Sequence, residues 1–156
     1  MNSKINKLNL GCGLDKKIDD TWIHIDRSPL CNPDIVRDIT LGLPFTDDTF
    51  DYVKADAILE HLGDDMLFVV SEVHRVCKPN AIFFIRVPHV YGRGAFQDPT
   101  HNRFFTDQTF KYFDHREILW KNFGRIYGIP KFEIVKQERG KMLLDVELRV
   151  IKDEEV

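Results

Sequence analysis

The chain has 156 residues, of which 43% are hydrophobic and 30% are charged, and its formal net charge is -3 at pH 7. This length suits one domain over residues 1–156, and the apolar fraction indicates a globular core rather than a disordered chain. Lysine and arginine are scattered without a dense run, which argues against a dedicated nucleic-acid-binding protein. No apolar stretch approaches the roughly 20 residues that span a bilayer, so no membrane association is expected.

The cysteines and the N-terminal residues bear on cellular location. Cys12, Cys31 and Cys77 form no CxxC pair, which argues against a disulfide framework and against a structural zinc site. Residues 1–4 lead straight into a strand-like segment without the apolar core of a signal peptide. We therefore predict a cytoplasmic protein with reduced thiols.

Short apolar runs alternate with polar turns in the first half of the chain. This pattern predicts strands at residues 5–10, 22–25, 34–39, 51–55 and 81–87. The last of these is almost continuously apolar, as expected for a strand buried on both faces of a parallel sheet. Apolar residues at helical spacing predict a helix over residues 65–76, which Asp64 or Asp65 could cap and which a turn at residues 78–80 ends.

The second half of the chain is less regular, and its first segment, residues 91–100, is predicted to be a loop. A short helix capped by Thr106 is expected to run to Phe113. Further predicted segments are a helical turn at 117–123 and two strands at 132–137 and 142–151, with a turn around Gly140 between them. This order predicts an α/β fold with a Rossmann-like, doubly wound, mostly parallel sheet and an antiparallel C-terminal hairpin.

A glycine pair, Gly11 and Gly13, follows the first predicted strand, where a nucleotide-like ligand docks in such sheets. The pair alone would equally describe a plain tight turn. Asp26 ends the second predicted strand, and a carboxylate there can accept hydrogen bonds from both hydroxyls of a ribose. The alternative is a solvated turn aspartate before Ser28 and Pro29.

The spacing after the glycine pair narrows the choice of ligand. A dinucleotide fingerprint needs a third glycine, and Lys16 stands at that position. Residues 14–21 leave space for a turn or two of helix only, which suits a pyrophosphate poorly. S-adenosylmethionine carries no phosphate, so it is favoured over the cofactor of a nicotinamide oxidoreductase.

Five segments, in order along residues 7–90, resemble motifs of class I S-adenosylmethionine-dependent methyltransferases of the type 11 subgroup. They are residues 8–13 (LNLGCG), 23–26 (IHID), 38–51 (with DI at 38–39, LPF at 43–45 and FD at 50–51), 58–62 (ILEHL) and 72–80 (EVHRVCKPN). The resemblance implies that residues 11–13 line the methionine end of the cofactor, that Asp26 holds the ribose and that Asp38 and Ile39 flank the adenine. His61 would lie near the cofactor or the acceptor. The implied cofactor-binding set is Leu10, Gly11, Cys12, Gly13, Asp26, Arg27, Asp38, Ile39, Asp56 and His61.

The sequence departs from this family at several points. Asn9 stands where an acidic residue is usual, the first helix is reduced, and Asn80 replaces the usual turn glycine. The first predicted strand starts near residue 5, so we expect no N-terminal helix of the kind that often covers the cofactor in this family. We therefore expect an open site that a partner or a second subunit closes.

The segment after the fifth predicted strand concentrates groups able to orient or deprotonate a nucleophile. His101, Asp98 and His89 are the predicted catalytic residues. The alternatives are that Asp98 forms a turn and His101 caps a helix, or that these three residues hold a metal, although their spacing matches no motif and no metal is predicted.

The sequence thus predicts an S-adenosylmethionine-dependent methyltransferase acting on an unidentified acceptor, for which a small molecule or a sugar is favoured. The alternative is a non-catalytic S-adenosylmethionine-binding or interaction protein with a methyltransferase fold.

Overall fold

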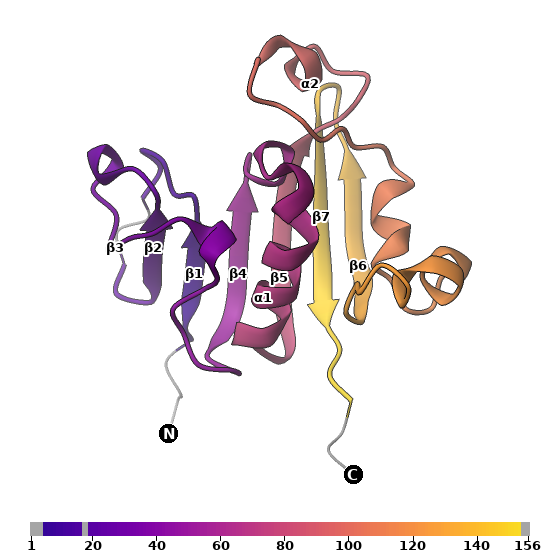
Figure 1. The fold of residues 1–156 in the computed structure, drawn as a ribbon, viewed down its shortest axis with the longest axis horizontal. Coiled ribbons are helices and arrows are strands. Elements are labelled where there is room, and N and C mark those ends of the chain that lie inside the picture. The colour runs from indigo at the N-terminus through magenta and orange to yellow at the C-terminus, as the bar shows by residue number, and fades with distance from the viewer. Residues whose placement is uncertain (1–4, 17–18, 154–156) are drawn as a thin grey trace.

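A seven-stranded sheet organises the chain in the computed structural model, which describes residues 5–16 and 19–153. The strand order across the sheet is β3-β2-β1-β4-β5-β7-β6 (Figure 1). The strands are β1 (Lys7–Leu10), β2 (Trp22–Asp26), β3 (Ile35–Val36), β4 (Phe50–Asp56), β5 (Cys77–Pro88), β6 (Phe132–Arg139) and β7 (Leu143–Val150). The first five run parallel, and β7 pairs antiparallel with both β5 and β6. The predicted fold class is confirmed.

The register of the central strands places the predicted site residues at one edge. Leu10 pairs with Ile25 on one side and with Ala55 on the other. The residues that follow on these three strands are therefore Gly11, Asp26 and Asp56, and they emerge side by side. In an open parallel sheet this carboxyl edge is where ligands bind.

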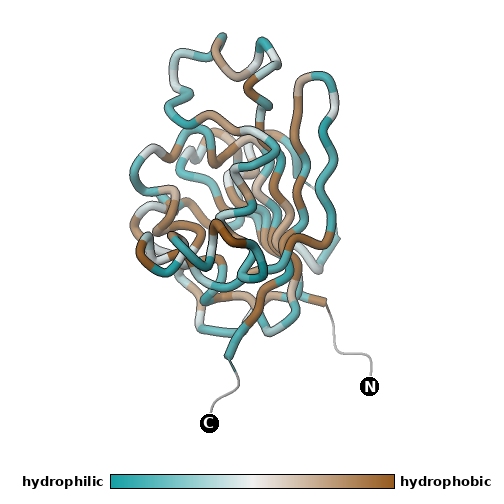
Figure 2. The backbone as a smooth tube through the Cα atoms, turned by 90° about the vertical axis from the view of Figure 1, so that its right-hand side faces the viewer, coloured by the Kyte–Doolittle hydropathy of each residue, from teal (hydrophilic) through white to brown (hydrophobic). Residues whose placement is uncertain are grey.

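Helices and loops cover one face of the sheet. The α-helix α1 (Met66–Val76) lies in front of β5 (Figure 1), and its residues Val69, Val70, Val73 and Val76 are fully buried. Figure 2 shows the sheet nearly edge-on, with the loops and helices gathered on one side of it. On the opposite face no described residues form a helical layer, and that face carries partly exposed side chains such as Lys54 and Arg86.

A second group of buried aromatic side chains extends the core under the C-terminal half. Phe105, Phe110, Phe113 and Phe132 are each at most 2% exposed. Their rings contact one another in the order Phe105, Phe110, Phe113 and Phe132, and the last of these lies on β6. The short helices of this half are α2 (Gly94–Gln97), the 3-10 helix η5 (Thr109–Tyr112) and the π-helical turn η6 (Trp120–Gly124).

Several predicted elements differ in length from those observed. The predicted strand 34–39 is reduced to Ile35–Val36, because Asp38 caps a 3-10 helix, η2 (Ile39–Leu41), by accepting a hydrogen bond from Thr40 N at 3.0 Å. The predicted turn at residues 78–80 is instead a bulge within β5. The pairing with β4 jumps there from Phe50↔Cys77 to Tyr52↔Ile82, and Asn80 has a φ of 66°.

The predicted helix starts are also corrected. No side-chain hydrogen bond from Asp64 or Asp65 caps α1, because a 3-10 turn, η4 (Gly63–Asp65), leads directly into it. The helix predicted to run from Thr106 to Phe113 is the single 3-10 turn η5. A tight turn precedes it, in which Thr106 N donates to Thr109 Oγ1 at 3.0 Å and Thr106 Oγ1 accepts from Gln108 N at 3.2 Å. Two 3-10 turns, η1 (Pro29–Cys31) and η3 (Leu59–His61), complete the elements.

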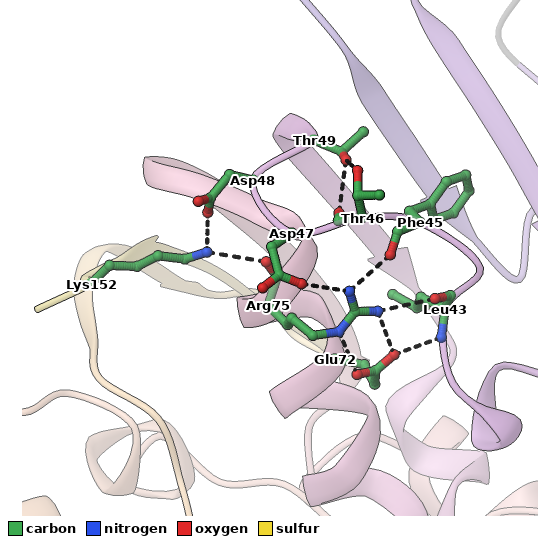
Figure 3. Close-up of polar contacts among 9 residues, drawn as sticks. All are labelled: Leu43, Phe45, Thr46, Asp47, Asp48, Thr49, Glu72, Arg75 and Lys152. Carbon is green, nitrogen blue, oxygen red and sulfur yellow. Dashed lines mark hydrogen bonds and ion pairs between the residues drawn. The ribbon is translucent and has the colours of Figure 1, made fainter. Parts of the chain in front are cut away.

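Arg75 on α1 fastens the loop that follows η2 (Figure 3). Its guanidinium donates to the carbonyl oxygens of Leu43 and Phe45 at 3.0 and 2.8 Å, and to Glu72 and Asp47 at 2.8 Å each. Glu72 in turn accepts from Leu43 N at 2.8 Å. This network holds the loop directly after η2 against α1, and so anchors the C-terminal side of the 3-10 helix that begins at Ile39.

Replacing Arg75 by methionine is expected to lower the free energy of unfolding by about 2 kcal/mol, because three partly buried acceptors lose their donor. Urea unfolding measures this change. Arg149→Met is the matched control, since Arg149 makes one exposed ion pair, 3.5 Å from Glu133, and should change stability by less than about 0.5 kcal/mol. Equal effects of the two substitutions would show that the network contributes nothing beyond surface pairing.

Candidate functional site

A cavity of about 800 Å³ opens at the carboxyl edge of β1, β2 and β4. Its volume falls within the range of pockets that bind small molecules and cofactors. Nine of the ten predicted cofactor-binding residues line it: Gly11, Cys12, Gly13, Asp26, Arg27, Asp38, Ile39, Asp56 and His61. The tenth, Leu10, is fully buried in the core and is not part of the lining.

The turn after β1 depends on its glycines. Gly11 has a φ of +58°, and a Cβ atom there would lie 2.0 Å from Ile58 Cδ1. Gly13 has a φ of +51°, and no described atom lies within 4 Å of the position that its Cβ would take. The first glycine is therefore required by packing, and the second leaves the backbone open to a ligand.

Asp26 joins this turn to the end of β2. Its Oδ2 accepts a hydrogen bond from Gly13 N at 3.0 Å, and its Oδ1 accepts from Ser28 N at 2.8 Å. Each carboxylate oxygen has two lone pairs, so each can accept one further hydrogen bond. The predicted ribose contact is compatible with these two bonds, and Asp26 also shapes the glycine turn.

The wall formed by η2 carries Asp38, Ile39 and Thr40. Asp38 Oδ1 accepts from Thr40 Oγ1 at 2.7 Å as well as from Thr40 N. The hydrogen bond from the Thr40 hydroxyl is the main cause that lowers the pKa of Asp38, so this carboxylate is ionised at neutral pH.

Two polar residues that the sequence did not single out as ligand contacts complete the wall along β1 and β4. Asn9 is 3% exposed, and its Nδ2 donates to Asp15 O at 3.1 Å, which supports the glycine turn. A carboxylate at this position could not donate that bond, which gives the departure from the family pattern a structural role. Lys54 Nζ lies 3.2 Å from Asp15 Oδ2 and 3.5 Å from Asp56 Oδ2.

On the opposite side of the cavity, η3 meets the loop after α2. His61 and Thr100 line the cavity here, and His61 Nδ1 lies 3.0 Å from Thr100 Oγ1. The carbonyl oxygen of Glu60 accepts from Asn102 N at 2.9 Å and from Arg103 N at 3.2 Å, so the loop is fixed to η3. Burial, followed by the neighbouring His101, lowers the pKa of His61 and keeps its ring neutral.

His61 belongs to a cluster with Glu60, Asp98 and His101, which we call the acceptor-side cluster. The rings of His61 and His101 are 4.7 Å apart between centroids and meet edge to face. His101 Nδ1 lies 3.2 Å from Ala95 O, so the neutral ring carries its proton there and its lone pair on Nε2. That Nε2 is 3.7 Å from Asp98 Oδ2 and 3.9 Å from Glu60 Oε1.

Glu60 is the most unusual side chain of this cluster. It is 1% exposed, and neither carboxylate oxygen has a hydrogen-bond partner among the described residues. Burial raises the pKa of Glu60 to about 7. In the sequence Glu60 is only one residue of the motif at 58–62, and no role was predicted for it, because burial of a single glutamate cannot be read from the local pattern.

The raised pKa of Glu60 predicts a pH-dependent stability. In the folded chain Glu60 stays protonated up to about pH 7, whereas in the unfolded chain it ionises near pH 4.5. The folded state thus binds one proton more between these values, and the free energy of unfolding falls by about 3 kcal/mol as the pH rises through them. Glu60→Gln, which resembles the protonated form, should lack this loss.

Urea unfolding in the presence of a metal chelator tests this prediction. We expect wild type and Glu60→Gln to be similar at about pH 5, and the variant to be more stable by roughly 2–3 kcal/mol at about pH 8. A stability difference that is the same at both pH values would contradict the prediction.

The predicted catalytic residues are only partly brought together. His101 and Asp98 meet in the acceptor-side cluster, next to lining residues but not themselves part of the lining. His89, at the end of β5, is 1% exposed, accepts from Tyr91 N at 3.2 Å and faces Asp107 at 3.6 Å. It does not line the cavity, and the structure groups Glu60 and His61 with His101 in its place.

The sequence of residues 8–85, half of the chain, matches the family described as methyltransferase domain. The chain belongs to this family. The predicted resemblance to class I methyltransferases is confirmed. The predicted S-adenosylmethionine cofactor is confirmed at the level of this methyltransferase family.

Solved structures with the same fold include three instructive examples. An S-adenosylmethionine-dependent methyltransferase from Aquifex aeolicus is 16% identical, with a TM-score of 0.63 over 95% of this chain and 83% of that chain. A Burkholderia thailandensis 1,6-didemethyltoxoflavin-N1-methyltransferase, solved with 1,6-didemethyltoxoflavin and S-adenosylhomocysteine, is 15% identical (TM-score 0.63, 94% and 71% covered). A complex of the Haloferax volcanii Trm112 methyltransferase activator with a methyltransferase gives 14% identity (TM-score 0.68, 100% and 86% covered).

These identities show the fold alone. No protein of curated function matches the chain in sequence. None of the helices in the described part of the chain has the length and apolar character that crossing a bilayer requires.

Proposed function

We propose that the chain transfers the methyl group of S-adenosylmethionine to a hydroxyl group of a small-molecule or sugar acceptor. The observation that carries this proposal is a single cavity with two chemically different sides. One side has the glycine turn with Asp26 and Asp38, and the other has His61 and Thr100 backed by the acceptor-side cluster. This arrangement suits a cofactor on the first side and a polar acceptor on the second.

The residues of the first side fit the cofactor. When bound, S-adenosylmethionine supplies an electrophilic methyl group on a positively charged sulfur. The lining carries five carboxylates (Asp15, Asp26, Asp38, Asp56 and Asp65) and three strongly basic side chains (Arg27, Arg37 and Lys54). This excess of negative charge favours a cationic ligand over a pyrophosphate. Asp26 would accept from the ribose hydroxyls, Asp38 and Ile39 would contact the adenine, and the open backbone at Gly13 would face the amino-acid end.

The residues of the second side fit a hydroxylated acceptor. Thr100 and His61 offer hydrogen-bonding groups at the cavity surface, and the ionised Asp98 lies next to them, because its hydrogen bond from the Thr100 hydroxyl lowers the pKa of Asp98. A hydroxyl must lose its proton as its oxygen forms the new bond to carbon. His101 and Asp98 lie close enough to this side of the cavity to receive that proton.

We further propose that a partner or a second subunit closes the cavity. Leu14 lines the cavity and is 89% exposed, which leaves an apolar side chain at the rim without cover among the described residues. One solved structure with this fold is itself a complex with an activator protein. We do not expect nucleic acid as a partner on the basis of the overall negative charge.

Radiolabelled methyl transfer tests this function. Purified protein is incubated with methyl-labelled S-adenosylmethionine and a panel of hydroxylated small molecules and monosaccharides, and cofactor binding is measured in parallel by calorimetry. Label in an acceptor supports the proposal. Binding without transfer to any acceptor would favour a non-catalytic protein that binds S-adenosylmethionine.

A further inference from the structure

We propose that Glu60, His61 and His101, which converge beside the cofactor cavity, form a binding site for a divalent transition-metal ion. Each residue offers one ligand atom, and these atoms lie within 4.8 Å of one another. Bonds of about 2.1 Å to a common ion place ligand atoms roughly 3–4 Å apart, so small side-chain rotations would suffice.

The buried carboxylate of Glu60 is the first argument for an ion. A glutamate that is 1% exposed with both oxygens unpartnered is costly, because burial of a polar group without a hydrogen bond is unfavourable. The His101 ring faces this carboxylate, but its Nε2 lies 3.9 Å from Glu60 Oε1 and makes no hydrogen bond with it. An ion between them would supply the partner that the protein does not.

The two imidazole rings are oriented as metal ligands are. In metal sites the second nitrogen of a ligating histidine is held by a carbonyl or another polar group, which fixes the tautomer. His101 Nδ1 is held by Ala95 O at 3.2 Å, and His61 Nδ1 by Thr100 Oγ1 at 3.0 Å. Both rings therefore keep the lone pair on Nε2. The loop after α2 holds the His61 ring, and α2 itself holds the His101 ring.

The donor set selects the class of ion. Two imidazole nitrogens and one carboxylate suit Zn²⁺, Fe²⁺, Mn²⁺ or Co²⁺, whereas Mg²⁺ and Ca²⁺ prefer oxygen ligands alone. Asp98 Oδ2, 3.7 Å from His101 Nε2, is close enough to act as a fourth ligand or to orient a bound water. This set differs from the one considered from the sequence, because Glu60 and His61 replace His89.

The role of the ion rests on the proposed function. His61 lines the cavity, so an ion that it binds would face the acceptor side. An acceptor hydroxyl on an open coordination position has a lowered pKa, and it can release its proton to Asp98 or to solvent at neutral pH. The electron pair left on the alkoxide oxygen would form the new bond to the methyl carbon. The bond between sulfur and that carbon would break at the same time, and its electron pair would stay on the sulfur of the leaving S-adenosylhomocysteine. His101 then acts as a ligand rather than as the proton acceptor.

Metal titration of the whole chain tests the site. Untagged protein is treated with EDTA, dialysed and titrated with Zn²⁺ by calorimetry, and with Co²⁺ by visible absorption. We expect one ion per chain with a Kd of roughly 10 µM or tighter. Glu60→Gln and His61→Asn should each weaken binding by at least about tenfold. His115→Asn is the matched control, because His115 pairs with Glu133 at 3.2 Å outside the cavity, and it should bind as wild type does.

Two results would overturn the site: no binding by wild type at about 100 µM metal, or Glu60→Gln and His61→Asn variants that bind as wild type does. S-adenosylhomocysteine binding is measured on the same samples, so that loss of the metal site and loss of the cofactor site are seen separately. If the cofactor product binds and metal does not, the metal site is wrong and the proposed function stands. If metal binds and the cofactor product does not, the proposed function fails while the site remains.

Discussion

Asp26→Ala is expected to weaken binding of S-adenosylhomocysteine by roughly 100-fold or more while the chain stays folded. The substitution would remove the two hydrogen bonds that we propose between Asp26 and the ribose, and a charge-assisted bond of this kind contributes about 1.5–3 kcal/mol. It also removes the acceptors of Gly13 N and Ser28 N, so the glycine turn loses its tie to β2. Isothermal calorimetry measures the affinity, and circular dichroism confirms the fold.

The control for this experiment is Asp153→Ala, an exposed aspartate that pairs with Lys131 away from the cavity. It should leave the affinity within about twofold of wild type. If Asp26→Ala bound the cofactor product as tightly as this control, the ribose assignment would be wrong.

His101→Ala is expected to lower kcat by roughly 100-fold or more while cofactor affinity changes little. His101 does not line the cavity, but its ring packs against His61 and faces Asp98 and Glu60. Its loss therefore removes either the residue that accepts the proton of the acceptor hydroxyl or a ligand of the ion that lowers the pKa of that hydroxyl. Methyl transfer to the acceptor found by the radiolabel assay gives kcat, and calorimetry gives the affinity.

His115→Ala is the matched histidine control, since its ring pairs with Glu133 outside the cavity. Unchanged turnover in His101→Ala would leave that histidine a structural residue that anchors its loop to Ala95. An equal loss of cofactor binding and turnover would instead indicate a distorted cavity.

The strands that build the cofactor side were readable from the sequence because each is a short apolar run that ends at a polar turn. Gly11, Asp26 and Asp56 directly follow such runs, and parallel pairing brings the ends of these strands together. The bulge in β5 was not readable, because a Pro79-Asn80 pair marks a turn locally and only the pairing with β4 shows that the strand continues through it.

The acceptor side was only partly predictable. Asp98 and His101 stood out as reactive residue types, but their partner Glu60 lies about 40 residues earlier in the chain. The two segments meet through hydrogen bonds that the backbone N–H groups of Asn102 and Arg103 donate to Glu60 O. The pattern of side chains in the sequence does not predict these backbone contacts. His89 looked equivalent to His101 in the sequence, yet the end of β5 directs it toward Tyr91 and Asp107.

Direct binding of S-adenosylhomocysteine to the purified chain is the simplest test of whether this cavity holds the cofactor. We predict one molecule bound per chain with a Kd of roughly 1–100 µM. Folded protein that shows no binding at about 1 mM ligand would mean that the cavity does not hold S-adenosylmethionine.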